Sequence, residues 1–334
     1  MSGGVDSSVA AALLLEQGHD VVGVTMKLWG GASDSGCCSV ADVDDARRVA
    51  QQLAIDHWVF SFTDDFDRHV VEPYVAAHAA GRTPNPCIEC NRRLKFDRLL
   101  RRADQLGFDA VATGHHARVV RRGNATLRLR RGADRAKDQS YVLYMLGRSQ
   151  LARCLFPVGD LTKAEVRARA AALGLRTANK VDSQDVCFVL ASGGRRAFLA
   201  PRVRLHAGRV VDIEGHEVGS VDAIELVTVG QRRGLGSAGG ERRYALAVDA
   251  ASATVTVGSL DDLLVDRVRL SELVWAGDGV TGSVLAQCSA HGHPVPATFD
   301  GEYAWFADRQ RAVAPGQSVV LYDRDEVLGG GIAV

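Results

Sequence analysis

Ser2-Gly3-Gly4-Val5-Asp6-Ser7-Ser8 is followed without a break by an apolar stretch of helical character, residues 9–15. Paired glycines let backbone amides approach an anion closely, serine hydroxyls add hydrogen-bond donors, and the first turn of a helix attracts negative charge. These residues therefore predict a loop that binds phosphate at the start of a helix. A helix cap in a serine- and glycine-rich turn would explain any single residue of this stretch, but it explains the seven residues together poorly.

The composition of this loop narrows its chemistry. It contains no lysine, so it differs from the GxxxxGK[ST] loop, and phosphoryl transfer to water or to a protein is disfavoured. Asp6 has no use in an anion cradle unless it binds a metal ion, which makes it a candidate Mg²⁺ ligand.

Short runs rich in β-branched residues alternate with helical stretches through the first half of the chain. This alternation predicts an α/β fold with a Rossmann-like, mostly parallel sheet and helices on its faces. The predicted strands are residues 20–28, 57–62 and 110–114, and the predicted helices are residues 8–17, 41–53, 66–80, 92–106 and 163–173. In such folds a central strand precedes the loop, and Met1 leaves no room for one. We interpret this as a gene start placed too late, with an impaired nucleotide site as the alternative.

From about residue 194 onward, short strands separated by glycines replace this alternation. Residues 210–218 predict a hairpin that turns at Glu214-Gly215, and residues 318–334 predict two strands joined at residues 323–325. We expect a Rossmann-like domain at residues 1–193, a small β-rich central domain at 194–252 and a C-terminal β-barrel at 253–334.

The composition indicates no membrane association and a cytoplasmic protein. The 334 residues are 46% hydrophobic and 24% charged, and no stretch approaches the roughly 20 apolar residues of a membrane span. The first residues lack the basic segment and apolar core of an export signal. Seven cysteines, including the close pairs Cys37-Cys38 and Cys87/Cys90, indicate reduced, reactive thiols rather than a secreted disulfide framework.

Charge is balanced over the whole chain, with 40 basic and 40 acidic residues, but it is unevenly distributed. Between Arg82 and Lys137 there are 15 basic and 5 acidic residues, a local excess of 10 positive charges. Such an excess is typical of a surface that binds a polyanion. The alternative explanation for this excess of positive charge is that the basic residues lie on solvent-exposed faces of a helix and a hairpin.

Two cysteine segments are candidates for catalysis. Cys87 and Cys90 stand immediately before a basic helix, where a thiol has a lowered pKa, so Cys90 is expected to be unusually nucleophilic. Cys187, in the segment Asp182-Ser-Gln-Asp-Val-Cys-Phe188, is the second candidate. Four alternatives stand for Cys90: half of a zinc site, a local redox pair with Cys87, an anchor for an iron–sulfur cluster, or a partnership with the distant Cys187.

The loop resembles the pyrophosphate-binding loop of PP-loop ATP pyrophosphatases, which adenylate a carbonyl oxygen. Further segments, in the same order along the chain, resemble the bacterial tRNA-specific 2-thiouridylase (MnmA) family. They are residues 81–91, 113–115, 137–144, 155–159, 182–188, 230–236 and 315–317. Because these segments span nearly the whole length, the chain is identified as a member of this family.

The resemblance implies a tRNA-uridine 2-sulfurtransferase that uses ATP and Mg²⁺. ATP would adenylate the 2-oxygen of the wobble uridine, Cys187 would deliver sulfur as a persulfide, and Cys90 would resolve it, leaving a Cys90–Cys187 disulfide. The implied sulfur donor is a cysteine desulfurase or a sulfur-relay protein. Binding of ATP is assigned by the resemblance to Ser2, Gly3, Gly4, Val5, Asp6, Ser7, Met26 and Gly114. Contact with tRNA is assigned to Asn85, Pro86, Cys87, His115, Lys137, Asp138, Gln139 and Gln317.

One departure from the family concerns Cys87, which stands where many members have an aspartate near the target base. A thiol titrates at about 8.5, whereas an aspartate titrates at about 4. We therefore expect Cys87 either not to take over the aspartate's proton transfer or to share it with another group. Two other functions remain open. One is a different ATP-dependent ligase or amidotransferase of the PP-loop superfamily, and the other is a degenerate tRNA-binding remnant without the first strand.

Overall fold

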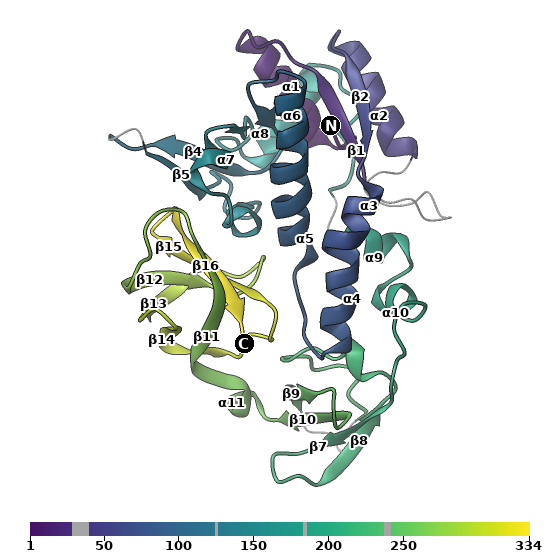
Figure 1. Ribbon diagram of the computed structural model, residues 1–334, viewed down its shortest axis with the longest axis vertical. Coiled ribbons are helices and arrows are strands. Elements are labelled where there is room, and N and C mark those ends of the chain that lie inside the picture. Colours follow the sequence, from purple (N-terminus) through teal and green to yellow (C-terminus); the bar gives the residue numbers. More distant parts are fainter. Residues whose placement is uncertain (29–39, 124–125, 183–185, 237–241) are drawn as a thin grey trace. The chain divides into compact units, whose positions relative to one another are not determined.

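The computed structural model describes residues 1–28, 40–123, 126–182, 186–236 and 242–334 (Figure 1). The Cys37-Cys38 pair and residues 183–185 of the second cysteine segment lie outside this part of the chain. The chain divides into two compact units, which are described separately. The first unit comprises Met1–Val70, Cys87–Gly194 and Asp325–Val327, and the second comprises Val71–Pro86, Arg195–Arg324 and Leu328–Val334.

The first unit contains the predicted alternation of strands and helices. Its opening elements are α1 (Val5–Glu16), β1 (Gly23–Lys27), α2 (Val40–Gln52), β2 (His57–Ser61) and α3 (Thr63–Phe66), followed by a π-helical turn at Asp67–Val71. Strands β1 and β2 pair in parallel, and a second parallel pair joins β3 (Val111–Ala112) to β6 (Cys154–Leu155). The expectation of parallel strands with intervening helices is therefore confirmed.

Helix α1 is fixed by an aliphatic core. Val5 and Val9 of α1 pack with Val166 and Ala170 of α8 (Lys163–Ala172), and all four are at most 2% exposed. Burial of each valine side chain contributes on the order of 1.5–3 kcal/mol. This core holds the loop that precedes α1 at a defined place beside the start of α8.

The basic helix begins earlier than the sequence predicted. It runs through α5 (Pro86–Glu89), a π-helical segment at Cys90–Arg98 and α6 (Leu99–Gln105), rather than starting at residue 92. Proline at the first helical position accounts for this start, because its ring presets φ and its missing N–H has no partner there in any helix. Cys90 consequently lies inside the helix rather than at its first turn.

The remaining elements of the first unit are short. They are the antiparallel hairpin β4 (Ala117–Arg121) and β5 (Leu127–Arg131), a 3-10 turn at Ser140–Leu143, α7 (Arg148–Leu151) and α9 (Cys187–Ala191). These two strands were not among the predicted strands, although residues 127–130 alternate leucine and arginine as a half-buried strand does.

The second unit contains the β-rich part of the chain. Its first elements are α4 (Glu72–Ala79), α10 (Arg195–Leu199), β7 (Gly208–Val211), β8 (Glu217–Val221), a 3-10 turn at Ile224–Leu226, β9 (Tyr244–Asp249) and β10 (Thr254–Gly258). The four strands form one sheet in the order β8-β7-β10-β9. The hairpin predicted at residues 210–218 is confirmed as the antiparallel pair of β7 and β8.

The last strands close into a barrel, drawn in yellow-green to yellow in Figure 1. After α11 (Leu260–Leu263) come β11 (Leu264–Trp275), β12 (Gly282–Gln287), β13 (Val295–Phe299), β14 (Tyr303–Arg311), β15 (Ser318–Asp323) and β16 (Glu326–Ala333). These strands are ordered β11-β14-β13-β12-β15-β16, and β16 pairs back to β11. Phe299, Val319 and Leu321 are fully buried in the barrel core. The predicted C-terminal β-barrel is confirmed.

None of the helices in the described part of the chain has both the length and the apolar character needed to cross a lipid bilayer.

Candidate active site

The predicted phosphate loop adopts a conformation that requires glycine. Gly3 has a φ of +69°, and a Cβ atom there would lie 2.4 Å from the carbonyl oxygen of Asp42. Ser2 and Ser7 approach each other through their hydroxyl oxygens at 3.2 Å, and the Ser8 hydroxyl donates to the Gly4 carbonyl at 2.8 Å. Among the described residues no side chain caps the first turn of α1, because its N-cap is Gly4. The donor set of this turn fits an anionic phosphate.

The segment that follows β3 lies directly against this loop. A Cβ atom at Gly114 would lie 2.6 Å from both the Asp6 carbonyl carbon and the Ser7 amide nitrogen. The structure therefore brings Gly114 together with the loop, as expected if both bind one nucleotide. Met26 lies in β1, and its contact with the nucleotide stays a prediction, as do those of Gly114 and the loop residues.

Asp6 is held by two cationic or polar side chains that the sequence did not single out. The Lys163 ammonium donates to both carboxylate oxygens of Asp6 at 2.7 Å, and Nε2 of the buried His116 lies 3.2 Å from Oδ1. Burial raises the pKa of Asp6, but the hydrogen bonds from His116 and Lys163 and the charge of Lys163 outweigh burial and hold that pKa below its usual value. Asp6 is thus an ionised carboxylate, and both of its oxygens accept hydrogen bonds.

A second carboxylate, Asp182, shares the Lys163 ammonium. Lys163 Nζ lies 2.9 Å from Asp182 Oδ1, and Asp182 also accepts from Lys137 and Arg167, each at 2.8 Å. Burial raises the pKa of Asp182, but the hydrogen bonds and charges of Lys137 and Lys163 dominate and lower the pKa to about 2. Asp182 precedes Cys187 by five positions in the sequence. A continuous ion-pair network therefore joins Asp6 of the phosphate loop, through Lys163, to Asp182.

The other members of the predicted KDQ segment have internal partners. Asp138 accepts from the side chain of Arg131 and from the backbone of Gly132 and Ser140. Gln139 Oε1 accepts from the His116 backbone N–H at 3.0 Å. These bonds hold the loop after β5 next to Asp6, and contact of either side chain with tRNA stays a prediction.

Sequence reasoning missed His116, Lys163 and Arg167. His116 follows the predicted site residue His115, and Lys163 is the first residue of the predicted helix at residues 163–173. Both residues therefore lie within or beside segments that the sequence analysis had already identified. Their roles could not be predicted, because the Lys163–Asp6 contact joins residues 157 positions apart.

The three nearby cysteines of the first unit are present as thiols. Cys87 is exposed, whereas Cys90 and Cys187 are half-buried. Removal from water raises the pKa of Cys90 to about 12, the Lys95 charge lowers it, and the charges of Cys187 and Cys87 raise it further. Cys90 therefore lies within electrostatic range of both other sulfurs.

The prediction of a lowered pKa at Cys90 is wrong. The helix begins at Pro86, so Cys90 lies one turn beyond the amides that would stabilise a thiolate, and burial dominates.

His115 occupies an apolar pocket rather than an open surface. Its ring packs against Phe96 and Phe156 at centroid distances of 5.9 and 6.0 Å, and its Nδ1 lies 2.7 Å from the Thr113 hydroxyl. Burial holds the pKa of His115 well below its usual value, so the ring is neutral at physiological pH. Contact between His115 and tRNA stays a prediction.

Gln317 and the segment before Cys87 meet within the second unit. The Gln317 side-chain amide donates to the Thr83 carbonyl, and the Thr83 amide donates to the Pro315 carbonyl at 2.8 Å. Gln317 is therefore adjacent to the segment that leads into Asn85 and Pro86, which the resemblance also assigns to tRNA contact. The contacts of Asn85, Pro86 and Gln317 with tRNA remain predictions.

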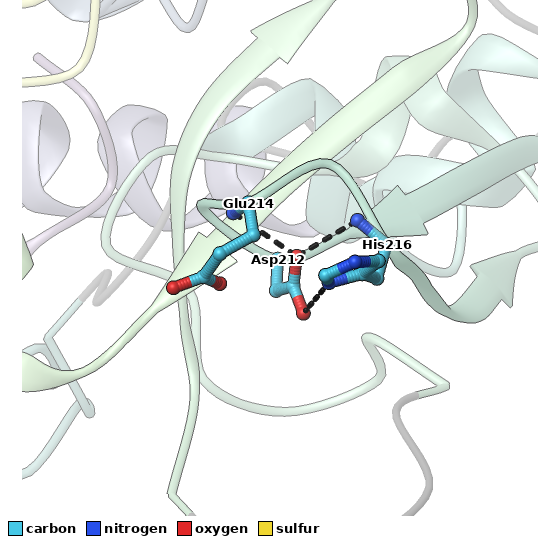
Figure 2. A group of neighbouring side chains, drawn as sticks. All are labelled: Asp212, Glu214 and His216. Atoms are coloured by element: carbon cyan, nitrogen blue, oxygen red, sulfur yellow. Dashed lines mark hydrogen bonds and ion pairs between the residues drawn. The ribbon is translucent and has the colours of Figure 1, made fainter.

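One further group of potential metal ligands lies at the turn between β7 and β8. Figure 2 shows Asp212, Glu214 and His216 on this exposed turn. Asp212 Oδ1 accepts from the backbone of Glu214 at 3.1 Å and of His216 at 2.8 Å. The three side chains are therefore close together because the Asp212 carboxylate stabilises the hairpin turn, and this explains the cluster without a metal ion.

Comparisons with known proteins agree with this architecture. Three family models match successive parts of the chain: a tRNA methyl transferase HUP domain at residues 1–191, a tRNA methyl transferase PRC-barrel domain at 196–259 and an aminomethyltransferase beta-barrel domain at 265–333. A tRNA-specific 2-thiouridylase MnmA from Chloroflexus aggregans is 48% identical, with 99% of this chain and 96% of the relative covered. The chain belongs to the MnmA family.

Other MnmA relatives are similar over more than nine tenths of their length. The MnmA proteins of Geotalea uraniireducens and Mycobacteroides abscessus are 44% and 45% identical and cover 99% of this chain, which covers 92% and 97% of theirs. The Rossmann-like, central and barrel parts expected from the sequence are those of the MnmA family. The exact boundaries at residues 193/194 and 252/253 remain predictions.

Proposed function

We propose that the protein catalyses ATP-dependent 2-thiolation of the wobble uridine of tRNA, with Cys187 as the sulfur carrier and Cys90 as the resolving thiol. Its relatives are named tRNA-specific 2-thiouridylases and match it from end to end. The observation that carries the proposal is that Cys90 and Cys187, although 97 positions apart in the sequence, fold into the same compact unit. Both also belong to the unit that contains the phosphate loop.

The first step is activation of uracil O2, which is a poor leaving group. We assign the amides at the start of α1 and the Lys163 ammonium to the ATP phosphates, where they stabilise the charge that develops as pyrophosphate departs. Uracil O2 attacks the α-phosphorus, so an O–P bond forms and the α–β phosphoanhydride bond breaks. The 2-oxygen is then part of AMP and can leave.

In the second step sulfur replaces this oxygen. The terminal sulfur of a Cys187 persulfide attacks C2, and AMP leaves with the oxygen, so uracil is linked through two sulfurs to Cys187. The Cys90 thiolate attacks the Cys187 sulfur, which releases 2-thiouridine and forms a Cys90–Cys187 disulfide. Two electrons from an external dithiol restore both thiols. Because the resting Cys90 has a pKa of about 12, its proton must pass to a base before this attack.

Mg²⁺ is part of the proposal through Asp6, whose carboxylate is a suitable ligand. Both oxygens of Asp6 accept from Lys163, so a metal ion can bind there only after this ammonium has moved. Mg²⁺ would neutralise phosphate charge, and Ser2, Ser7 and the first turn of α1 would orient the same phosphates.

The test is thiolation by the purified protein. The chain is incubated with ATP, Mg²⁺, unmodified tRNA and a persulfide donor, and nucleosides are measured by mass spectrometry. Wild type is expected to form 2-thiouridine with one AMP per product, and Cys187→Ser to form none. Cys288→Ala, which removes a thiol from the second unit, serves as the matched control and retains activity.

Undiminished 2-thiouridine in Cys187→Ser would exclude the persulfide route. Consumption of ATP by Cys187→Ser on a small substrate without tRNA would instead favour a ligase or amidotransferase.

A further inference from the structure

Cys87 and Cys90 lie one turn apart on the same side of a helix. The helix begins at Pro86, and its first turn, Pro86–Glu89, continues directly into the helical segment Cys90–Arg98. Residues three positions apart in a helix have Cβ atoms about 5–6 Å apart, whereas a disulfide needs about 3.5–4.5 Å. A small local closure therefore brings the two sulfurs to bonding distance, and a bond formed under such strain is readily reduced.

The helical turn that carries both thiols is anchored through its other side chains. Ile88, which lies between the two cysteines, is only 2% exposed. The Asn91 side-chain amide donates to the Val142 carbonyl at 3.0 Å, and Glu89 pairs with Arg92 at 3.5 Å. Because these contacts hold the turn, the two thiols remain neighbours in the resting protein.

The three thiols of the first unit differ in their access to solvent. Cys87 is exposed, whereas Cys90 and Cys187 are half-buried. The rate of thiol–disulfide exchange depends on access to the sulfur that is attacked, and a protein reductant reaches an exposed sulfur more readily than a half-buried one. A disulfide that contains Cys87 is therefore open to a protein dithiol, whereas a disulfide between Cys90 and Cys187 is shielded.

We propose that Cys87 is a third working thiol of the reaction, which transfers the disulfide of Cys90 and Cys187 to an exposed position. The Cys87 thiolate attacks Cys90 Sγ, so a Cys87–Cys90 bond forms, the Cys90–Cys187 bond breaks and Cys187 leaves as a thiolate. This exchange needs no external electrons, and it restores Cys187 for the next load of sulfur.

An external dithiol, such as a reduced thioredoxin, completes the cycle. One of its thiolates attacks Cys87 Sγ, and Cys90 leaves and takes up a proton. The second thiolate of the dithiol then displaces Cys87, so the dithiol is oxidised to a disulfide and supplies the two electrons. The source of the Cys90–Cys187 disulfide rests on the proposed function, whereas the pairing of Cys87 with Cys90 does not.

The first experiment maps the disulfides of the full chain after a single turnover without reductant. Persulfidated protein reacts with ATP, Mg²⁺ and unmodified tRNA, and the remaining thiols are blocked in acid with N-ethylmaleimide. Trypsin leaves Cys87 and Cys90 in one peptide, residues 83–92. A bond between them leaves this peptide unblocked and unlinked, whereas a Cys90–Cys187 bond links it to a second peptide.

Wild type is expected to give the internal Cys87–Cys90 bond together with blocked Cys187. Cys87→Ser is expected to give only the Cys90–Cys187 link. A wild-type protein that retains only the Cys90–Cys187 link, with Cys87 blocked, would overturn the proposal.

The second experiment follows repeated turnover with thioredoxin or with the small reductant dithiothreitol. Each rate is divided by the single-turnover rate of the same variant, so that a weakened contact with tRNA cancels. Cys87→Ser is expected to lose most of this ratio with thioredoxin and to recover it with excess dithiothreitol. Cys87→Asp, which introduces the side chain of many family members but no thiol, should behave in the same way. Cys288→Ala, which removes a thiol from the second unit, is the matched control and should keep the wild-type ratio.

Equal ratios in wild type and Cys87→Ser with thioredoxin would also overturn the proposal. If wild type forms no 2-thiouridine, the proposed function fails, and oxidation of the resting chain by diamide then decides the pairing. Diamide must produce the internal Cys87–Cys90 bond in wild type, and its absence would show that the two thiols do not form a working pair.

Discussion

The thiol of Cys90 lies fifth in a helix that begins at Pro86, and the residue is half-buried. A helix terminus and neighbouring arginines lower a thiol pKa only where the thiol faces them, and burial acts in the opposite direction. The net effect here is a pKa of about 12, because burial outweighs the Lys95 charge, which lowers the pKa. Cys90 is therefore a protonated thiol in the resting protein.

Alkylation rates provide a test of this state. At pH 8 a thiol with a pKa of about 12 is ionised to only about one part in ten thousand, so iodoacetamide should label the exposed Cys87 long before Cys90. The rate at Cys90 should rise about tenfold per pH unit from pH 8 to pH 10. Lys95→Gln should slow it further, because a favourable charge is lost. A rate at Cys90 that levels off near pH 8 would contradict this prediction.

At the scale of elements, the chemistry depends on how closely β3 approaches α1. Gly114 follows β3 and leaves no room for a side chain next to the backbone of Asp6 and Ser7. The phosphate loop and the helix after it were predictable from the sequence because glycines, serines and an apolar stretch are local signals. The contact of Gly114 with the loop became an expectation only through the family resemblance, since no local pattern encodes it.

Gly114→Ala should displace the phosphate loop. The new Cβ would lie 2.6 Å from backbone atoms, which cannot rotate away as a side chain can, so α1 or the strand end must shift. We expect ATP affinity to fall at least about tenfold, since a shift of about 1 Å in a positioned group has effects of up to a hundredfold. Gly123→Ala, where nothing lies within 4 Å of the new Cβ, is the control. Unchanged binding in Gly114→Ala would show that the loop tolerates the displacement.

At the scale of the whole molecule, the two compact units do not follow the order of the sequence. Residues 71–86 precede Cys87 directly but belong to the second unit, where His78 of α4 lies 3.1 Å from the Glu225 carbonyl oxygen. The barrel and most of the longer helices were predictable from local patterns of apolar residues and glycines, whereas the β4–β5 hairpin was not predicted. The assignment of residues 71–86 was not, because helix α4 looks the same in sequence whichever unit it packs with.

The buried His78 gives the second unit a pH dependence. Burial, and to a lesser extent the Arg195 charge, lowers the pKa of His78 to about 4, below an unfolded value near 6.5. Below pH 6.5 the unfolded chain binds a proton that the folded chain resists, so stability falls as the pH decreases from about 6.5 to about 4, by at most about 3 kcal/mol.

Thermal melts at pH 7.5 and pH 5 test this prediction. His78→Gln should lose part of the difference between the two melting temperatures, because glutamine does not titrate. His19→Gln, at an exposed position, should retain the wild-type difference. Identical pH dependence in His78→Gln and wild type would show that another group is responsible.

The excursion of Asp325–Val327 into the first unit has a consequence for synthesis on the ribosome. Asp325 pairs with Arg135 at 2.6 Å and Glu326 with Arg122 at 2.9 Å, and Arg122 and Glu326 are 204 positions apart. Domains made first usually fold while later ones are still being translated. Here Arg122 and Arg135 are synthesised long before the carboxylates that pair with them, so the first unit reaches its final charge balance only after most of the second unit has been translated.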